Sequence, residues 1–164
     1  MRAAVKPNAL IWLALSLVLI ALDQWTKHIA LSALQWEGNS IVFIDGFWNW
    51  KLHYNPGAAF SFMANAGRVG HWFFVVLAFV ISTALIVLLS RTRRSDWRSA
   101  LPFALIVAGA LGNVIDRLRI GHVIDFVDWY VGNYHWPVFN IADSCIVGGA
   151  IGLVLFSFGA KKSG

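Results

Sequence analysis

The residues of this chain whose types and spacing best fit catalysis are its aspartates and glutamate. Four of its eight acidic residues lie in one segment, residues 112–144, between long apolar runs. Acidic side chains in such membrane-like surroundings are costly and usually functional. Asp125 lies in the apolar context VIDF, and Asp143 follows Asn140 near the start of an apolar run. Neither aspartate has a lysine or arginine within three positions, so both are candidates for chemistry.

These two carboxylates could form an acid–base pair. The apolar runs beside them, at about 100–115 and 139–158, are consecutive, so as antiparallel membrane helices they would bring their outer ends together. Two carboxylates in a partly dry site cannot both ionise easily, so one pKa rises strongly. The result is one acid and one base, as hydrolysis of a peptide bond by an activated water requires. The residues alone leave open which of the five outer acids would pair.

The other acids have simpler interpretations. Asp23 and Lys27 are four residues apart, a spacing that favours an ion pair within one helix. Asp116 is followed by two arginines, so we expect charge pairing that anchors this helix end at the membrane interface. Asp128 is expected to be solvated in a loop.

Metal, serine and nucleotide chemistry have little support. The sequence contains no HExxH motif, no GxSxG elbow and no glycine-rich phosphate loop. Its single cysteine, Cys145, excludes an internal disulfide and a multi-cysteine metal site, and we expect it to be a small packing residue. The sequence therefore predicts neither a metal nor a cofactor.

The composition is that of a membrane protein. The chain of 164 residues is 59% hydrophobic and 13% charged, with a mean hydropathy of +0.66. A soluble domain is about half apolar and a quarter charged. The length allows about four spans of ~20 residues each. The net charge of +5 comes from short basic clusters beside apolar runs, which is a topology signal and does not indicate nucleic-acid binding.

We predict one integral-membrane domain, residues 1–164, with spans at about 9–30, 71–90, 99–118 and 139–159. The first run resembles a signal peptide, but no cleavage site follows it, so we expect an uncleaved span. Small residues in the last two runs should let helices pack closely; they are Ala108, Gly109, Ala110, Gly112, Gly148, Gly149 and Gly152. The basic clusters place both termini in the cytoplasm and most acids at the outer face.

The outer segments are predicted to hold a small sheet. Residues 41–54 form two extended runs around Asp45-Gly46, which is a strong hairpin signal. One face of the second run is expected to carry Trp48, Trp50, Leu52 and Tyr54. This face could be an interfacial aromatic belt, or part of a sheet that shapes a site beneath it. With a short interfacial helix at 30–34, the predicted fold is an all-α membrane protein of four transmembrane helices plus a hairpin.

Five motifs, in order, resemble those of lipoprotein signal peptidases, the bacterial signal peptidase II family. They are LDQWTK (22–27), NPGAAFSF (55–62), GNVIDR (112–117), VIDF (123–126) and FNIADS (139–144). The resemblance covers the whole chain and implies an aspartyl endopeptidase of the bacterial cytoplasmic (inner) membrane. Such an enzyme needs no cofactor and cleaves diacylglyceryl-modified prolipoproteins just before the lipidated cysteine.

The resemblance also assigns residues. Asp125 and Asp143 match the family's catalytic pair. Positions that would bind substrate or fix the pair are Asn55, Gly57, Asn113, Arg117 and Asn140. Positions with a structural or supporting role are Asp23, Lys27 and Asp116. The implied partners are prolipoprotein substrates, membrane lipid and the inhibitor globomycin, with the enzyme acting as a monomer.

A small membrane transporter or proton relay is the alternative function, because outer acids and arginines can gate ions. A relay needs ionisable groups across the whole membrane, whereas these acids cluster at one end of the spans. A passive assembly scaffold is a third interpretation, and it would tolerate loss of both aspartates.

Overall fold

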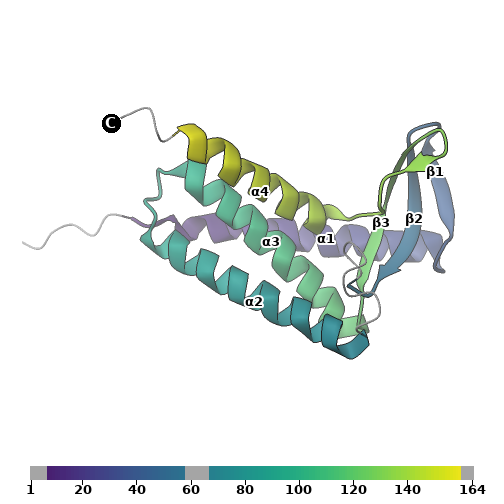
Figure 1. Ribbon diagram of the computed structural model, residues 1–164, viewed down its shortest axis with the longest axis horizontal. Helices are drawn as coiled ribbons and strands as arrows, with labels where there is room; N and C mark the ends of the chain where they lie inside the picture. The colour runs from purple at the N-terminus through teal and green to yellow at the C-terminus, as the bar shows by residue number, and fades with distance from the viewer. Residues whose placement is uncertain (1–6, 58–66, 160–164) are drawn as a thin grey trace, which may run out of the picture.

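The computed structural model describes residues 7–57 and 67–159, in which a bundle of helices carries a small sheet at one end (Figure 1). The helices are α1 (Leu13–Leu34), α2 (Gly67–Arg91), α3 (Trp97–Ile120) and α4 (Ile141–Gly159), with a 3₁₀ turn, η1 (Ala9–Trp12), before α1. The strands are β1 (Ser40–Ile44), β2 (Trp48–Asn55), β3 (Val123–Val131) and β4 (Tyr134–His135).

Each predicted span is a helix, and the differences lie at the ends. Among the described residues, three helices are long and apolar enough to cross a membrane: Ala9–Leu34, Arg68–Arg91 and Trp97–Ile120. The apolar stretch of α4, Ile141–Ser157, is shorter. α4 begins two residues later than predicted because Phe139 is held in an antiparallel bridge with Val127 of β3.

The expected short interfacial helix at residues 30–34 is not a separate element. α1 continues unbroken to Leu34 and ends where Gln35 takes a positive φ of 66°. A positive φ is unfavourable inside a helix for a residue with a side chain, so the chain turns here toward β1. The predicted helix is therefore the last part of α1.

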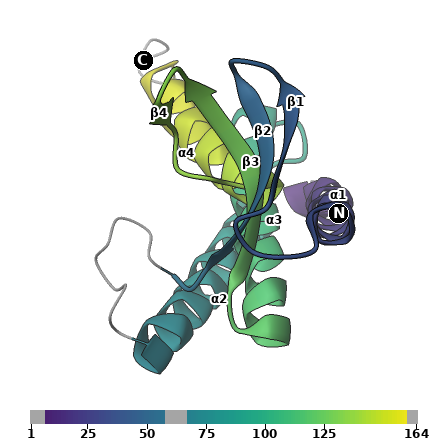
Figure 2. The same cartoon turned by 90° about the vertical axis from the view of Figure 1, so that its right-hand side faces the viewer.

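The protein is mostly helical with a small sheet, as predicted, but the sheet is larger than the predicted hairpin. β1 and β2 pair antiparallel around Asp45-Gly46, which confirms the hairpin. β2 then pairs with β3 and β3 with β4, giving an antiparallel sheet in the order β1-β2-β3-β4. Seen from its own end of the molecule, the sheet lies across the ends of the helices (Figure 2).

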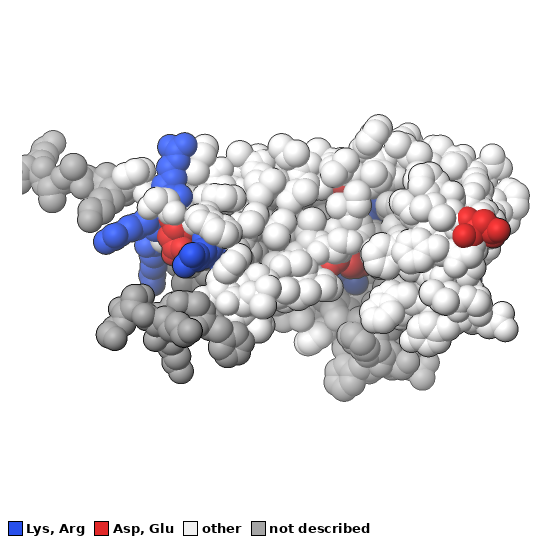
Figure 3. Space-filling view, turned by 90° about the horizontal axis from the view of Figure 1, so that it is seen from above, with Lys and Arg blue, Asp and Glu red and all other residues white. Residues whose placement is uncertain are grey.

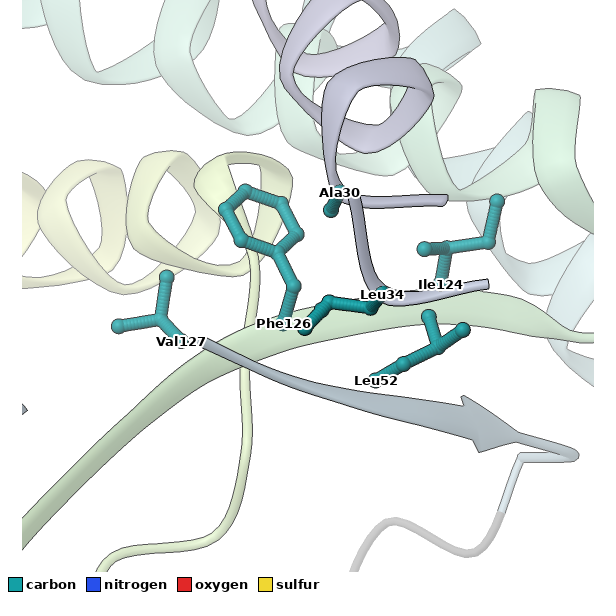
Figure 4. Close-up of a cluster of buried hydrophobic side chains, with 6 residues drawn as sticks. All are labelled: Ala30, Leu34, Leu52, Ile124, Phe126 and Val127. Atoms are coloured by element: carbon teal, nitrogen blue, oxygen red, sulfur yellow. The ribbon is translucent and has the colours of Figure 1, made fainter. Parts of the chain in front are cut away.

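An apolar cluster fixes the sheet to the end of α1. Its buried members are Ala30, Leu34, Leu52, Ile124, Phe126 and Val127, and Trp48, Trp50 and Tyr54 pack against it. Figure 4 shows Ile124 and Phe126 pointing from β3 toward α1, with Leu52 rising from β2. Because side chains alternate along a strand, the residue between Ile124 and Phe126 faces the opposite side. That residue is Asp125.

Glycines let α3 and α4 approach closely, as the small-residue pattern predicts. A Cβ on Gly109 would meet the carbonyl oxygen of Ala142, and one on Gly149 would lie 2.6 Å from Ile106 Cγ1. The prediction was wrong for Gly148, because a Cβ there would meet nothing within 4 Å. The close contact therefore involves one face of α4, and it brings the start of α4 against α3.

Candidate active site

Asp125 on β3 and Asp143 in the first turn of α4 meet around the side chain of Asn140. Asn140 Nδ2 donates to Asp125 Oδ1 at 2.7 Å, while the Asn140 N–H donates to Asp143 Oδ2 at 3.3 Å. In return the Asp143 N–H donates to Asn140 Oδ1 at 2.8 Å. This exchange has the form of a capping box, with asparagine as the N-cap and aspartate three residues later. The cap that starts α4 thus also connects the two aspartates.

Two further asparagines hold the carboxylates. Asn55, at the end of β2, donates from Nδ2 to Asp125 Oδ2 at 3.1 Å. Asn113, on α3, donates from Nδ2 to Asp143 Oδ1 at 2.8 Å. Amide donors stabilise the ionised form of a carboxylate, so three asparagines oppose the tendency of this site to stay protonated.

The direction of each amide is fixed by a group that can only donate. Asn55 Oδ1 accepts from the Gly57 N–H at 2.9 Å, and Asn113 Oδ1 accepts from Lys27 Nζ at 3.1 Å. Asn140 Oδ1 accepts from a backbone N–H, as described above. Since a backbone N–H or an ammonium group offers no lone pair, the amide cannot be reversed without losing a bond. All three NH₂ groups therefore face the aspartates.

Burial and charge perturb Asp125. Its side chain is 1% exposed, whereas Asp143 is partly exposed. Burial and, next, the charge of the neighbouring Asp143 raise the pKa of Asp125 to about 7, against the hydrogen bonds from Asn55 and Asn140 and the charge of Lys27, which lower it. Near neutral pH this pair can therefore hold one proton, which gives an acid and a base side by side.

A buried charge cluster lies beneath the aspartates, between α1 and α3. Lys27 Nζ lies 2.8 Å from Asp23 Oδ2, which confirms the predicted ion pair within α1. The same atom lies 2.7 Å from Asp116 Oδ2. The prediction that Asp116 pairs with its neighbouring arginines was wrong, because the packing of α3 against α1 supplies a closer partner.

The two neighbouring arginines, Arg117 and Arg119, contact other residues. The Arg117 guanidinium lies over the Phe74 ring of α2 at 5.2 Å. Its buried Nε has no hydrogen-bond partner within the described part of the chain. Arg119 Nη1 donates to Gln24 Oε1 at 3.4 Å. Arg117 thus presents a cation that interacts with the charges of Asp143 and Asp125 and whose Nε–H can still donate a hydrogen bond.

Gly57 is required by space and by backbone conformation. Its φ is +105°, and a Cβ would lie 2.9 Å from Phe74 Cδ2. A side chain here would therefore both strain the backbone and displace the ring beneath Arg117. The rest of its motif, residues 58–62, lies outside the described residues.

Sequence reasoning missed one polar residue of the buried cluster. Gln24 Nε2 donates to Asp116 Oδ1 at 2.8 Å and to the Gly112 carbonyl at 3.2 Å, joining α1 to α3. Its place beside Asp23 in LDQWTK was the available signal, but an amide next to a single charged residue has no distinctive spacing.

Asp128 was predicted to be solvated, and this was wrong. Its side chain is 1% exposed, with His135 Nδ1 at 2.8 Å from Oδ1 and Asn49 Nδ2 donating to Oδ2 at 3.3 Å. These partners come from β2 and β4, so Asp128 holds the sheet together. Across residues 7–57 and 67–159, no group of three or more His, Cys, Asp or Glu side chains is arranged to hold a metal ion.

Comparison with known proteins places this site in a family. The model of the signal peptidase (SPase) II family matches residues 15–159. A lipoprotein signal peptidase of Xanthomonas campestris pv. campestris (strain 8004) is 60% identical over 159 residues, covering 96% of this chain and 95% of that protein. One from Xylella fastidiosa (strain M12) is 56% identical over 164 residues, covering 99% and 98%.

A solved structure described as a bacterial membrane enzyme has the same fold. It aligns with a TM-score of 0.80 at 30% identity and covers 97% of this chain and 96% of its own. The aspartates, asparagines and charge cluster described above all lie within the matched residues 15–159. Sequence and fold agree, and the chain belongs to the signal peptidase II family.

Proposed function

We propose that this chain is an aspartic endopeptidase that removes the signal peptide from prolipoproteins, with Asp125 and Asp143 as its catalytic pair. Membership of the signal peptidase II family and near full-length identity to lipoprotein signal peptidases support the activity. One observation supports the chemistry most directly: a buried aspartate with a pKa of about 7 is connected through Asn140 to a second, partly exposed aspartate.

The pair can hydrolyse a peptide bond without a covalent intermediate. The ionised carboxylate takes a proton from a water molecule, whose oxygen attacks the scissile carbonyl carbon. The protonated carboxyl group donates its proton to the carbonyl oxygen, on which negative charge develops during the attack. The tetrahedral intermediate then collapses as its C–N bond breaks. The amine nitrogen receives the proton that the first carboxylate took from water, and the proton on the former carbonyl oxygen returns to the second carboxylate. Which aspartate begins with the proton is a property of the pair as a unit.

The surrounding residues have distinct proposed roles. Asn55, Asn113 and Asn140 hold the two carboxylates in place, and Gly57 fixes the turn that directs Asn55. Arg117 can donate from its guanidinium to backbone carbonyls of the substrate, because its described contacts leave it without a carboxylate partner. The buried cluster of Asp23, Lys27 and Asp116 supports the pair from below.

We place the whole chain as one multi-pass domain in the bacterial inner membrane, with both termini in the cytoplasm and the site near the outer face. Basic side chains gather at the bundle end away from the sheet (Figure 3), and in the described residues they are Arg91, Arg93, Arg94 and Arg98. Basic clusters favour the cytoplasmic side. The other predicted basic segments include residues 1–6 and 160–164, which lie outside the described part.

This placement suits a lipid-modified substrate. A signal helix and the acyl chains of a diacylglyceryl-modified cysteine would stay in lipid, while the scissile bond just before that cysteine reaches water at the outer interface. We propose that the enzyme acts as a monomer and that globomycin binds at the same site. A transporter or proton relay is not favoured, since the buried acids and lysine of the described residues lie at or near the sheet and form no chain across the bundle.

The test uses a diacylglyceryl-modified precursor and the purified protein. Asp125→Asn and Asp143→Asn should each lower the cleavage rate by at least about 10³-fold, because each removes one proton-transfer group. Both variants should still fold and insert. Asp45→Asn, on the exposed turn between β1 and β2, is the matched control and should cleave normally. Cleavage by either dyad variant at near the wild-type rate would refute the assignment.

A further inference from the structure

A single buried lysine, Lys27, connects the two chain segments that carry the catalytic aspartates. Its Nζ is 2.8 Å from Asp23 Oδ2 on α1 and 2.7 Å from Asp116 Oδ2 on α3, and all three side chains are at most 2% exposed. Buried charges are tolerated only when they are paired and hydrogen-bonded. The ammonium and both carboxylates therefore form one unit with a fixed geometry.

Each of these carboxylates also accepts a bond from a peptide N–H. Asp23 Oδ1 accepts from the Ala142 N–H at 2.9 Å. Asp116 Oδ2 accepts from the Ile124 N–H at 3.2 Å. Ala142 is the residue immediately before Asp143, and Ile124 is the residue immediately before Asp125. The Lys27 ammonium is thus connected to the main chain before Asp143 through Asp23, and to the main chain before Asp125 through Asp116.

We propose that Lys27 is a positioning residue that sets the separation of the two catalytic aspartates, by holding the backbone before Asp143 through Asp23 and the backbone before Asp125 through Asp116. This inference rests on the proposed function of the pair. It assigns the cluster a task in catalysis beyond general support of the fold.

The third donor of the ammonium reaches Asp143 through the side chain of Asn113. Lys27 Nζ donates to Asn113 Oδ1 at 3.1 Å, and Asn113 Nδ2 donates to Asp143 Oδ1 at 2.8 Å. An ammonium group has three N–H donors, and here each has a partner. The lysine therefore also fixes which end of the Asn113 amide faces the catalytic carboxylate.

Stability alone gives a poor account of this arrangement. A buried ion cluster is often no more stabilising than apolar side chains of the same volume, because desolvation of the charges offsets their attraction. The fold also makes room for it: a Cβ on Gly112 would lie 2.9 Å from Asp23 Oδ2. Carboxylates held in a defined position accept directed hydrogen bonds from the Ala142 and Ile124 N–H groups, which apolar side chains cannot do.

The test compares two variants. Lys27→Met removes the ammonium at similar volume but leaves Asp23 and Asp116 as unpaired buried charges, so it can fail to fold. The triple variant Asp23→Asn, Lys27→Met, Asp116→Asn is neutral, and its two asparagines can still accept the Ala142 and Ile124 N–H groups. Circular dichroism and thermal melting in detergent establish which variants are folded.

For the folded variants, we expect kcat for the diacylglyceryl-modified precursor to fall about 100-fold while KM stays within about threefold, because misplaced groups slow chemistry without weakening substrate binding. A variant that only loosened the fold would lower the melting temperature and leave kcat unchanged. Lys51→Met on β2, outside the cluster, is the control and should keep both constants.

A folded triple variant whose kcat stays within about tenfold of wild type would overturn the proposal. So would an equal rise in KM that accounts for the whole loss of activity. These results are distinct from failure of the proposed function, which would appear as cleavage by Asp125→Asn. Inactive Asp125→Asn together with a fully active triple variant would leave the catalytic pair in place and remove only the role of Lys27.

Discussion

At the scale of single residues, the site balances burial against directed hydrogen bonds. Burial and the Asp143 charge raise the pKa of Asp125 to about 7, while amide donors from Asn55 and Asn140 act in the opposite direction. Gly57 and Lys27 hold the amides in the orientation that allows this. The result is a carboxyl that titrates near neutral pH, where an acid–base pair is most useful.

The raised pKa of Asp125 predicts an alkaline limb in the pH profile of kcat. As the pH rises through about 7, the pair loses its remaining proton and becomes doubly ionised, so no acid remains for the scissile carbonyl. The rate should therefore fall above this pH. Asn55→Ala removes a bond that lowers this pKa, so the limb should move to higher pH. A limb that stays in place in Asn55→Ala would contradict this account.

At the scale of elements, the position of Asp143 depends on how closely α4 approaches α3. The start of α4 is held by the Asn140 cap and by Asp23, which accepts the Ala142 N–H. Gly109 allows the contact, because a Cβ there would lie 2.7 Å from Ile146 Cγ1 and would also meet the Ala142 carbonyl oxygen. The helix that carries Asp143 therefore rests directly on a glycine.

Gly109→Ala should destabilise the protein by about 1–3 kcal/mol, the usual cost of overpacking a tight contact. It should also lower kcat, because the added methyl group pushes the first turn of α4 away from α3. Thermal unfolding in detergent and precursor cleavage measure the two effects.

Gly148→Ala is the matched control, since a Cβ at Gly148 would meet nothing within 4 Å. It should leave activity unchanged and melt at the same or a higher temperature, because alanine favours a helix by about 1 kcal/mol over glycine. Equal effects of the two substitutions would show that the contact at Gly109 does not control α4.

At the scale of the whole molecule, charge separates the two ends. Four arginines lie in and around the connection between α2 and α3, while the turn between β1 and β2 carries Asp45 at the opposite end (Figure 1). In a bacterial membrane this distribution favours the proposed orientation, in which the sheet faces outward. The proposed catalytic pair lies beside the sheet, and so would face the compartment where a translocated precursor emerges.

Cysteine labelling tests this orientation. In a Cys145→Ala background, Asp45→Cys should react with a membrane-impermeant maleimide in intact spheroplasts, whereas Ser95→Cys should react only after permeabilisation. Both positions are exposed, so accessibility to the reagent depends on the side of the membrane. The reverse labelling pattern would invert the proposed topology.

The amino-acid sequence by itself determined the elements that local physics controls. Apolar runs longer than a bilayer core become helices, because only then are their backbone polar groups satisfied in lipid. The Asp45-Gly46 turn directs its hairpin in the same local way, and the i, i+4 spacing of Asp23 and Lys27 predicts their ion pair. The candidate aspartates were also found from sequence, but the choice of Asp125 and Asp143 among the acids came from the family motifs.

Only the tertiary structure decided which side chains meet across elements. The segment VIDFVDWYV becomes β3 because β2 offers a free edge and α1 an apolar face. Asp116 pairs with Lys27, and Asp128 is buried with His135, through contacts made by separate elements. The link from Lys27 to the backbone before Asp125 and before Asp143 is of the same kind. Charge pairing depends on distance in space, and sequence spacing reports that distance only within a single helix or turn.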